Sequence, residues 1–316
     1  MELKTEKIGK SFSGVNVLRN VDFKLIPGEV HALVGENGAG KSTFVKILSG
    51  VYTPSFGNIF LDKNKVEITS PIVAQKNGVS LIHQEPQSFS HLSVAENIFM
   101  GHMDGNNFSR VKWQDINNKS KEILQSIGLK IDPKIIMDGL SIADQQMIEI
   151  AGALSKNSRV LIMDEPTSPL TPNEVGKLFE IVNKLKSDGM AIIFISHRLE
   201  EIREISDRVT IFRDGDLIIS KKTSEITNEE IIKYMIGRNI ENTEVKNNDY
   251  ISKEEYVLNI KNLSLEKKFN NISFNLKRGE ILGFAGLVGA GRTDVAKSIF
   301  GAENSTKERL FITVRK

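Results

Sequence analysis

Short, mainly apolar runs recur along the chain, and helical patterns separate them. The runs cover residues 30–34, 79–82, 160–163 and 191–195. Runs of this length and composition are typical of strands buried on both faces of a parallel sheet. Between the last two runs, Thr171 and Glu174 form the pattern of an N-terminal capping box, and one apolar face then continues to Asp188. Alternating strands and helices predict an α/β fold.

Two regions depart from this alternation. The first sixty residues, with turn signals at Ser13-Gly14 and Pro27-Gly28, predict a mainly antiparallel β layer. Residues from about 86 to 155 predict a mostly helical subdomain inserted into the α/β core. Further on, Asp214-Gly215 between two apolar runs predicts a β-hairpin. We therefore expect a first domain over residues 1–240, followed by a polar linker over 241–255.

Composition fits a globular protein of 316 residues, with 40% hydrophobic and 26% charged residues. The chain has no cysteine, which excludes disulfides and thiolate metal sites. Its net charge of +2 gives no support to a nucleic-acid partner. The longest purely apolar run, residues 190–195, is far too short to span a bilayer, and the N-terminus lacks the order of a secretory signal. We therefore expect a cytoplasmic protein.

A glycine-rich loop follows the first apolar run and precedes a helical pattern. Its sequence is Gly35-Glu36-Asn37-Gly38-Ala39-Gly40-Lys41-Ser42, and Thr43 comes next. Between a strand and a helix, glycines let the backbone turn so that its N–H groups surround phosphate oxygens. Lys41 is expected to reach the β- and γ-phosphates of a nucleotide, and Ser42 to bind Mg²⁺. The alternative is a glycine-rich turn that binds nothing, which the spacing and context disfavour.

Two acidic residues follow the apolar run at 160–163. If this strand lies beside the glycine-rich loop, Asp164 would contribute to a Mg²⁺ site and Glu165 could polarise an attacking water. The alternative is a strand that merely ends in solvated carboxylates, because acids are common at such positions. The phosphate loop upstream favours the catalytic interpretation.

The order of these motifs resembles that of the ATP-binding cassette ATPases. The motifs that carry the resemblance are the phosphate loop, Gln84, Leu140-Ser141, Asp164-Glu165 and His197. The resemblance implies a P-loop nucleoside triphosphatase with a RecA-like α/β core, an antiparallel β layer and a helical subdomain. It also implies ATP and Mg²⁺ as cofactors, and two cassettes that close head to tail around the nucleotide.

The resemblance also implies roles for single residues. Gln84 would touch Mg²⁺ or the attacking water, and His197 would contact the γ-phosphate. Phe12 stands where the family stacks an aromatic ring on adenine, with plain core packing as the open alternative. Ser141 and Ala143 lie in the signature segment, whose helix points at the γ-phosphate held by the partner cassette.

This signature departs from the usual Leu-Ser-Gly-Gly-Gln, because Ile142, Ala143 and Asp144 follow Ser141. The Ala143 methyl group is expected to weaken close approach of the backbone to phosphate. Ser141 followed by Asp144 also fits an ordinary helix N-cap, so that alternative stays open. Pro169 replaces the usual Ala or Ser in the loop that crosses between cassettes, and it stiffens that segment.

The chain begins a second copy of its first unit. Positions 251 residues apart carry the same residue type at Asn271, Gly279, Gly286, Gly291 and Gly301. Residues 256–302 supply the start of a second cassette, truncated and with Arg292 in place of the loop lysine, and residues 303–316 match nothing that should follow. This piece carries no acidic strand, signature or switch histidine. We therefore expect a non-catalytic copy that is poorly packed or leans on the first cassette.

Two tandem cassettes with an arginine in the second loop resemble the sugar-import ATPases of the ribose, galactose, rhamnose and autoinducer types. Residues 82–86, 95–102 and 195–202 also carry this resemblance. It implies a peripheral subunit on the inner face of the plasma membrane that docks on transmembrane permease subunits, and through them serves a sugar-binding protein. The docking groove would be bordered by residues 93–101 of the helical subdomain. With the second cassette cut short, we expect ATP hydrolysis to be slow unless two first cassettes associate.

Two other interpretations compete with sugar import. Tandem-cassette ATPases that act on ribosomes or DNA would favour a basic linker, whereas the linker here is mildly acidic. A nucleotide-binding fragment that drives no transport is the other alternative.

Overall fold

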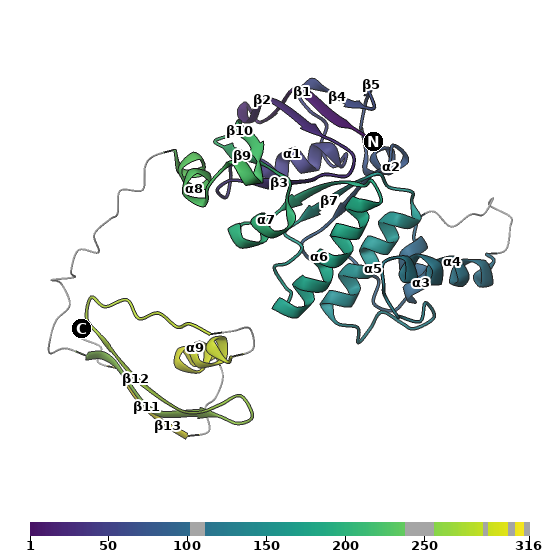
Figure 1. Ribbon diagram of the computed structural model, residues 1–316. Helices are drawn as coiled ribbons and strands as arrows, with labels where there is room; N and C mark the ends of the chain where they lie inside the picture. Colours follow the sequence, from purple (N-terminus) through teal and green to yellow (C-terminus); the bar gives the residue numbers. More distant parts are fainter. Residues whose placement is uncertain (102–110, 238–255, 287–289, 303–306, 313–316) are drawn as a thin grey trace. The chain divides into compact units, whose positions relative to one another are not determined.

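The structure is a computed structural model that describes residues 1–101, 111–237, 256–286, 290–302 and 307–312 (Figure 1). The chain divides into two compact units, Met1–Asn239 and Ile240–Lys316. Residues 241–255, which the sequence predicts as a linker, lie outside the described residues.

A six-stranded sheet forms the centre of the first unit, in the order β10-β9-β3-β8-β7-β6. The strands are β3 (Val30–Val34), β6 (Val79–Ile82), β7 (Val160–Asp164), β8 (Ala191–Ile195), β9 (Arg208–Arg213) and β10 (Asp216–Lys222). Neighbouring strands pair in parallel, except for the antiparallel pair β9 and β10. The four strands predicted from apolar runs are confirmed, and they form the parallel centre of the sheet.

Both faces of β3, β6, β7 and β8 are buried, which explains why these strands are mainly apolar. In β8, Ile192 and Phe194 enter one hydrophobic cluster, while Ile193 and Ile195 enter another. Helices cover both faces (Figure 1). They are α1 (Lys41–Leu48), α2 (Pro71–Lys76), α6 (Pro172–Ser187), α7 (Leu199–Ile205) and α8 (Asn228–Ile236), with the short 3-10 helix η1 (Thr223–Glu225). The capping box predicted for α6 is confirmed, because the N–H of Thr171 donates to the Glu174 carboxylate at 2.8 Å.

The predicted hairpin is formed by β9 and β10. Asp214 and Gly215 both have positive φ, at 52° and 87°, as the tightest hairpin turns require. A Cβ at Gly215 would lie 2.5 Å from the carbonyl oxygen of Val17, so the turn packs closely on the neighbouring layer. Glycine is therefore needed there for two reasons, the backbone angle and the close contact.

The predicted antiparallel layer is confirmed. Its strands are β1 (Leu3–Phe12), β2 (Val15–Leu25), β4 (Phe56–Leu61) and β5 (Asn64–Val66), in the order β2-β1-β4-β5. The side chains of Leu3, Ile8 and Phe23 are buried in the same cluster as Phe44 of α1. The layer thereby closes over the helix that follows the glycine-rich loop.

The helical subdomain is also confirmed, with α3 (Val94–Phe99), α4 (Trp113–Ser126) and α5 (Ile142–Ser155). Residues 102–110 lie outside the described part. At the start of α3, the N–H of Ser93 donates to Glu96 at 2.7 Å and Glu96 donates back to Ser93 at 3.2 Å, which makes the predicted capping box. The described helices include none that is both long and apolar enough to cross a membrane.

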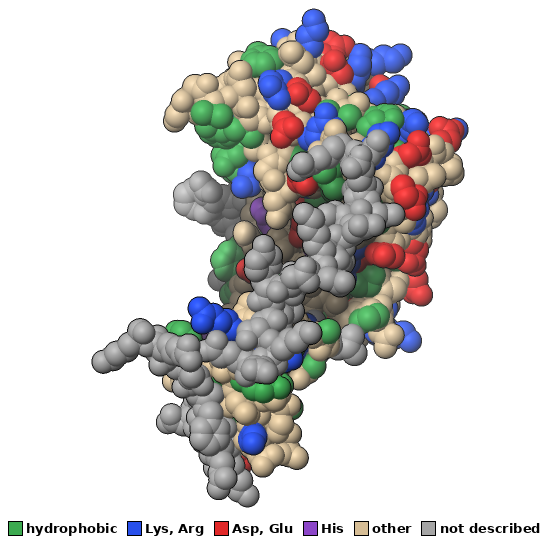
Figure 2. Space-filling view, turned by 90° about the vertical axis from the view of Figure 1, so that its left-hand side faces the viewer, with side chains coloured by type: hydrophobic (Ala, Val, Ile, Leu, Met, Phe, Trp, Pro, Cys, Tyr) green, Lys and Arg blue, Asp and Glu red, His purple; other side chains and the backbone are tan. Residues whose placement is uncertain are grey.

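Charged side chains are mixed on the face of the molecule shown in Figure 2. Lysine and arginine alternate there with aspartate and glutamate rather than gathering into a single basic patch. Such a mixture is typical of a solvated surface.

The second unit repeats the start of the first. Its elements are β11 (Tyr256–Leu265), β12 (Phe269–Lys277), α9 (Arg292–Phe300) and β13 (Lys307–Ile312), with the sheet order β12-β11-β13. Among the described residues of this unit, the hydrophobic cluster contains three buried side chains, those of Ile260, Leu263 and Val295. Ile281 and Phe300 are 93% and 89% exposed. Poor packing of the described part of this unit is therefore confirmed.

Glu149 of α5 is a mostly buried carboxyl group. One of its oxygens accepts a hydrogen bond from the Gln87 N–H, and the other is buried without a hydrogen-bond partner. Burial raises the pKa of Glu149 to about 7, although the Gln87 N–H and the charge of Lys156 lower it. The folded protein therefore holds this proton at pH values where an unfolded chain releases it.

We expect Glu149→Gln to remove part of the pH dependence of stability. Between the ordinary glutamate pKa of 4.5 and the folded value of about 7, the folded state binds more protons than the unfolded state. The free energy of unfolding therefore falls as pH rises through this range, by about 3 kcal/mol at most. Urea unfolding at acidic and mildly alkaline pH measures it, with Glu180→Gln on α6 as the exposed control. Equal pH dependence in Glu149→Gln and the unmodified chain would contradict this origin.

Candidate functional site

The glycine-rich loop lies between β3 and α1, as its sequence context predicts. Gly35 has a φ of 156° and Gly40 one of 103°. A Cβ at Gly35 would lie 2.3 Å from the carbonyl oxygen of Phe212, and one at Gly40 would lie 2.6 Å from Leu18. These two glycines therefore let the loop pack against β9 and β2. A Cβ at Gly38 would meet no atom within 4 Å, so this part of the loop faces open space.

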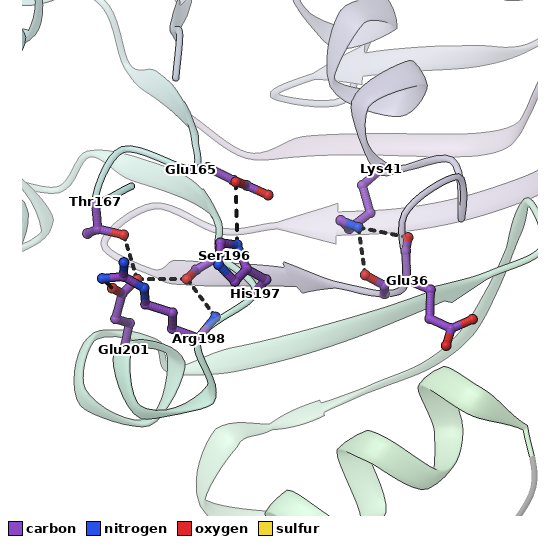
Figure 3. A network of polar contacts seen from close by, with 9 residues as sticks. Glu36, Lys41, Glu165, Thr167, Ser196, His197, Arg198 and Glu201 are labelled. Carbon is purple, nitrogen blue, oxygen red and sulfur yellow. Dashed lines mark hydrogen bonds and ion pairs between the residues drawn. The ribbon is translucent and has the colours of Figure 1, made fainter. Parts of the chain in front are cut away.

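Lys41 is the first residue of α1, and its ammonium group turns back onto the loop. Nζ donates to the carbonyl oxygen of Gly35 at 2.7 Å and to that of Glu36 at 3.1 Å (Figure 3). Burial lowers the pKa of Lys41, while the charges of Glu165 and Asp164 raise it. The lysine thus lies in the field of the acidic pair. Ser42 and Thr43 follow in the first turn of the same helix.

The acidic pair ends β7, next to β8 in the sheet. Burial and then the charge of Glu165 raise the pKa of Asp164, whereas His83, Lys41 and Lys46 lower it. Glu165 has a φ of 47°, which is uncommon for a residue other than glycine, and its N–H donates to the carbonyl of Ile195 at 3.0 Å. This geometry places the two carboxyl groups at the carboxyl edge of the sheet.

His197 reaches the acidic pair from the end of β8. Its Nδ1 lies 3.4 Å from Oε2 of Glu165, and the imidazole is 63% exposed (Figure 3). The structure therefore brings Glu165 and His197 together, as the motif order suggests. Next to them, Thr167, Ser196 and Arg198 all donate hydrogen bonds to the carboxylate of Glu201. Sequence reasoning missed the role of Glu201, because its place in the first turn of α7 predicts only a helix cap and not its contact with Thr167.

Gln84 is exposed and lies just beyond β6, the edge strand beside β7. Its neighbour His83 was also missed. Burial lowers the pKa of His83, the charge of Asp164 raises it, and Lys46 lowers it. His83 is therefore part of the electrostatic surroundings of Asp164.

Phe12 ends β1 and is 37% exposed. Its ring packs edge-on against Tyr52 with 5.2 Å between centroids, and Lys10 Nζ lies 5.1 Å from the centroid of Phe12. Lys46 of α1 lies 5.6 Å from the Tyr52 centroid and connects this aromatic pair to the helix after the loop. Tyr52 was not predicted.

Ser141 and Ala143 lie at the start of α5 in the helical subdomain. The hydroxyl of Ser141 accepts from the Asp144 N–H at 3.1 Å and donates to the Asp144 carboxylate at 2.9 Å, so it is a helix N-cap. The Ala143 methyl group is buried in the subdomain core. Among the described residues, no hydrogen bond or ion pair joins either residue to the phosphate loop.

The second loop is only partly described, because residues 287–289 lie outside the described part. Gly286 and Gly291 have φ values of 158° and 78°, close in sign and region to their counterparts in the first loop. Arg292 opens α9 as Lys41 opens α1. The backbone of the first loop is thus repeated at these positions.

The first loop and its surroundings fit a nucleotide phosphate with Mg²⁺. The open side of the loop and the N-terminus of α1 present N–H groups and the positive end of the helix dipole. Ser42 and Asp164 offer oxygen ligands, the type that Mg²⁺ prefers, and phosphate oxygens and water can fill its remaining positions. Within the described ranges, no group of three or more His, Cys, Asp or Glu residues could hold a metal ion.

Comparison with known proteins identifies the family. Residues 18–168 match the family described as ABC transporter. Residues 18–168 are therefore a domain of this family. The chain is 46% identical over 301 residues to the ribose import ATP-binding protein RbsA 2 of Streptomyces avermitilis, which covers 95% of this chain and 59% of that protein. It is 45% identical over 315 residues to RbsA of Clostridium tetani, which covers 99% of this chain and 62% of that protein.

A putative ribose/galactose/methyl galactoside import ATP-binding protein of Burkholderia cenocepacia is 46% identical to this chain over 297 residues. This match covers 94% of the chain and 58% of the relative. The chain therefore spans about three fifths of the length of these curated relatives.

Solved cassettes share the fold. The ADP conformation of MJ1267, an ATP-binding cassette of an ABC transporter, matches with a TM-score of 0.65 at 25% identity, covering 75% of this chain and 95% of that one. A dimeric post-hydrolysis state of the cassette MJ0796 bound to ADP and Pi matches with a TM-score of 0.60 at 21% identity, covering 70% and 98%. The predicted P-loop fold with its β layer and helical subdomain is confirmed.

Proposed function

We propose that the first unit binds ATP with Mg²⁺ and hydrolyses it. One observation carries the proposal: the ends of three adjacent parallel strands bring the phosphate loop, the acidic pair and His197 to one edge of the sheet. Phosphoryl transfer to water requires groups of these kinds: a lysine ammonium at the N-terminus of a helix, two carboxylates and an imidazole.

Each group has a distinct role in this proposal. The loop amides and Lys41 hold the β- and γ-phosphates, while Ser42 and Asp164 hold the metal ion, which neutralises charge on the phosphates when bound. Glu165 accepts a hydrogen bond from the attacking water and orients it. His197 donates a hydrogen bond to the γ-phosphate, and its contact with Glu165 at 3.4 Å keeps the two side chains on the same side of the site.

Binding must change the contacts of Lys41. Its ammonium donates to the carbonyl oxygens of Gly35 and Glu36, and phosphate oxygens replace at least one of these acceptors when the nucleotide enters. The exchange is favourable because charge-assisted hydrogen bonds to phosphate are stronger than those to a neutral carbonyl. The exposed Phe12 and the partly buried Tyr52 beside it provide an aromatic surface for the adenine ring.

Hydrolysis further requires a second cassette. In this proposal, the N-terminus of α5, with Ser141 and the backbone at Ala143, faces the γ-phosphate held by a partner cassette. The Ala143 methyl group is buried, which supports access of the phosphate to the backbone there. Ile142 is 50% exposed beside it and is available for contact with the partner. Two first cassettes can pair in this way, so we expect hydrolysis to rise with protein concentration.

We further propose that the chain energises import of a sugar. The support is its similarity to relatives that are named ribose or ribose/galactose/methyl galactoside import ATP-binding proteins. Transmembrane permease subunits would dock near Ser93 and α3, and a sugar-binding protein would act through them, which places the chain at the cytoplasmic face of the membrane. These names do not favour the ribosome- or DNA-acting alternative.

Replacing Lys41 tests ATP binding. Lys41→Ala should weaken retention of labelled ATP in the presence of Mg²⁺ by at least about tenfold, because one charge-assisted contact to the phosphates is lost. Lys76→Ala on α2, which removes an exposed lysine, is the control and should bind as the unmodified chain does. Equal ATP retention by the Lys41→Ala variant and the unmodified chain would remove the basis of the proposal.

Replacing Glu165 separates hydrolysis from binding. Glu165→Gln should slow hydrolysis of bound ATP by at least about a hundredfold, because an amide cannot accept a proton from the attacking water. The affinity for ATP should stay within about twofold, because Glu165 is not expected to hold the phosphates. Single-turnover measurements with labelled ATP give both quantities. An unchanged rate would show that another group orients the water.

A further inference from the structure

Glu201 of α7 is a buried carboxylate with three side-chain donors. Its side chain is 8% exposed. Oε2 accepts from Thr167 Oγ1 and from Ser196 Oγ, each at 2.7 Å, and Oε1 accepts from Arg198 Nη1 at 3.1 Å (Figure 3). Buried carboxylates are costly unless they are fully hydrogen-bonded and neutralised, and this one meets both conditions.

The donors come from the two segments that carry Glu165 and His197. Thr167 follows Glu165 by two residues, and Ser196 directly precedes His197. These segments leave the adjacent strands β7 and β8 and are also joined by the bond from the Glu165 N–H to Ile195. Glu201 is therefore a second bridge between the same two strand ends.

Ordinary helix capping does not account for this arrangement. In a capping box, the third residue of the helix accepts a hydrogen bond from the N-cap N–H. Here the N-cap N–H, that of Arg198, donates to the hydroxyl of Ser196 at 3.0 Å, and Ser196 then donates to Glu201. The carboxylate can therefore accept a hydrogen bond from Thr167, which belongs to neither α7 nor its cap.

The contact between Glu165 and His197 needs such support. The imidazole is 63% exposed, and ion pairs with an exposed partner contribute little by themselves. Glu165 also has positive φ, a conformation that persists only when its surroundings hold it. Thr167 and Ser196, fixed on one carboxylate, supply that restraint from both sides.

We infer that Glu201 is a positioning residue, which holds Glu165 and His197 at the separation that hydrolysis of ATP requires. This inference rests on the proposed function. It predicts that loss of the carboxylate slows the hydrolytic step while the phosphate loop continues to bind ATP. The loop lies between β3 and α1, and within the described part of the chain it shares no hydrogen bond with Glu201.

The test is Glu201→Gln in the full chain, with Glu200→Gln as the matched control. Glutamine keeps the size of the side chain, but it offers one oxygen where two are used. Glu200 is the exposed neighbour on the same helix. We expect Glu201→Gln to hydrolyse bound ATP at least about tenfold more slowly with an ATP dissociation constant within about twofold, because small misplacement of reacting groups is costly. Glu200→Gln should change neither quantity.

Thr167→Val provides a second, independent variant. It keeps the shape of the side chain and removes only the hydroxyl that donates to Glu201. It should also slow hydrolysis, and the double variant should be about as slow as Glu201→Gln alone, because both changes break one bridge. Rates are measured per bound ATP, so a loss of folded protein by itself would not lower them.

Several outcomes would overturn the inference. Hydrolysis by Glu201→Gln within about twofold of the unmodified chain would do so, as would equal slowing by Glu200→Gln. If the unmodified chain binds ATP without hydrolysing it, the proposed function fails instead. Amide hydrogen exchange then tests whether Glu201 holds the two strand ends together. Protection of the Glu165 N–H should fall in Glu201→Gln and not in Glu200→Gln. Unchanged protection would contradict the bridge itself.

Discussion

Parallel pairing of β3, β8 and β7 is the constraint on which the site depends. In this register Ile195 of β8 lies opposite Leu33 of β3 on one side and Asp164 of β7 on the other. Parallel strands end at the same edge, so the segments that follow them emerge together. The phosphate loop, the acidic pair and His197 are neighbours for this reason, although more than 160 residues separate the first from the last. Burial of both faces of the sheet fixes that register, because a slip by one residue would exchange the two hydrophobic clusters.

Much of this arrangement could be predicted because it is local. The apolar runs, the Ser93 and Thr171 capping boxes and the Asp214-Gly215 turn depend on residues only a few positions apart. The candidate chemistry was equally accessible, because Lys41, Asp164 and Glu165 sit at fixed offsets from strands that can be recognised. Their roles in catalysis remain predictions.

The parts that were missed depend on contacts between distant segments. Glu201 meets Thr167 across 34 residues of sequence, and Tyr52 meets Phe12 across 40. Neither partner carries a local pattern that indicates the other. His83 was passed over because it precedes the more familiar Gln84, yet it is His83 whose charge acts on Asp164. The orientation of Ala143 into the subdomain core likewise depends on how α5 packs, which its short motif does not encode.

The second unit shows what a strand needs besides an apolar sequence. Residues 281–285 correspond to β3, yet they form no strand, and Ile281 is almost fully exposed. In the first unit, β3 lies between β8 and β9, which hydrogen-bond to both of its edges. The described part of the second unit offers residues 281–285 no such neighbours, so an apolar sequence alone does not make them a strand.

The most direct test of the central claim is a crystal structure of the Glu165→Gln variant with ATP and Mg²⁺. We expect phosphates enclosed by the amides of the loop from Asn37 to Ser42. Lys41 Nζ should have left at least one of its loop carbonyls for a phosphate oxygen, and His197 should lie within hydrogen-bonding distance of the γ-phosphate. Nucleotide bound elsewhere, or a Lys41 that still holds both loop carbonyls beside it, would contradict the account.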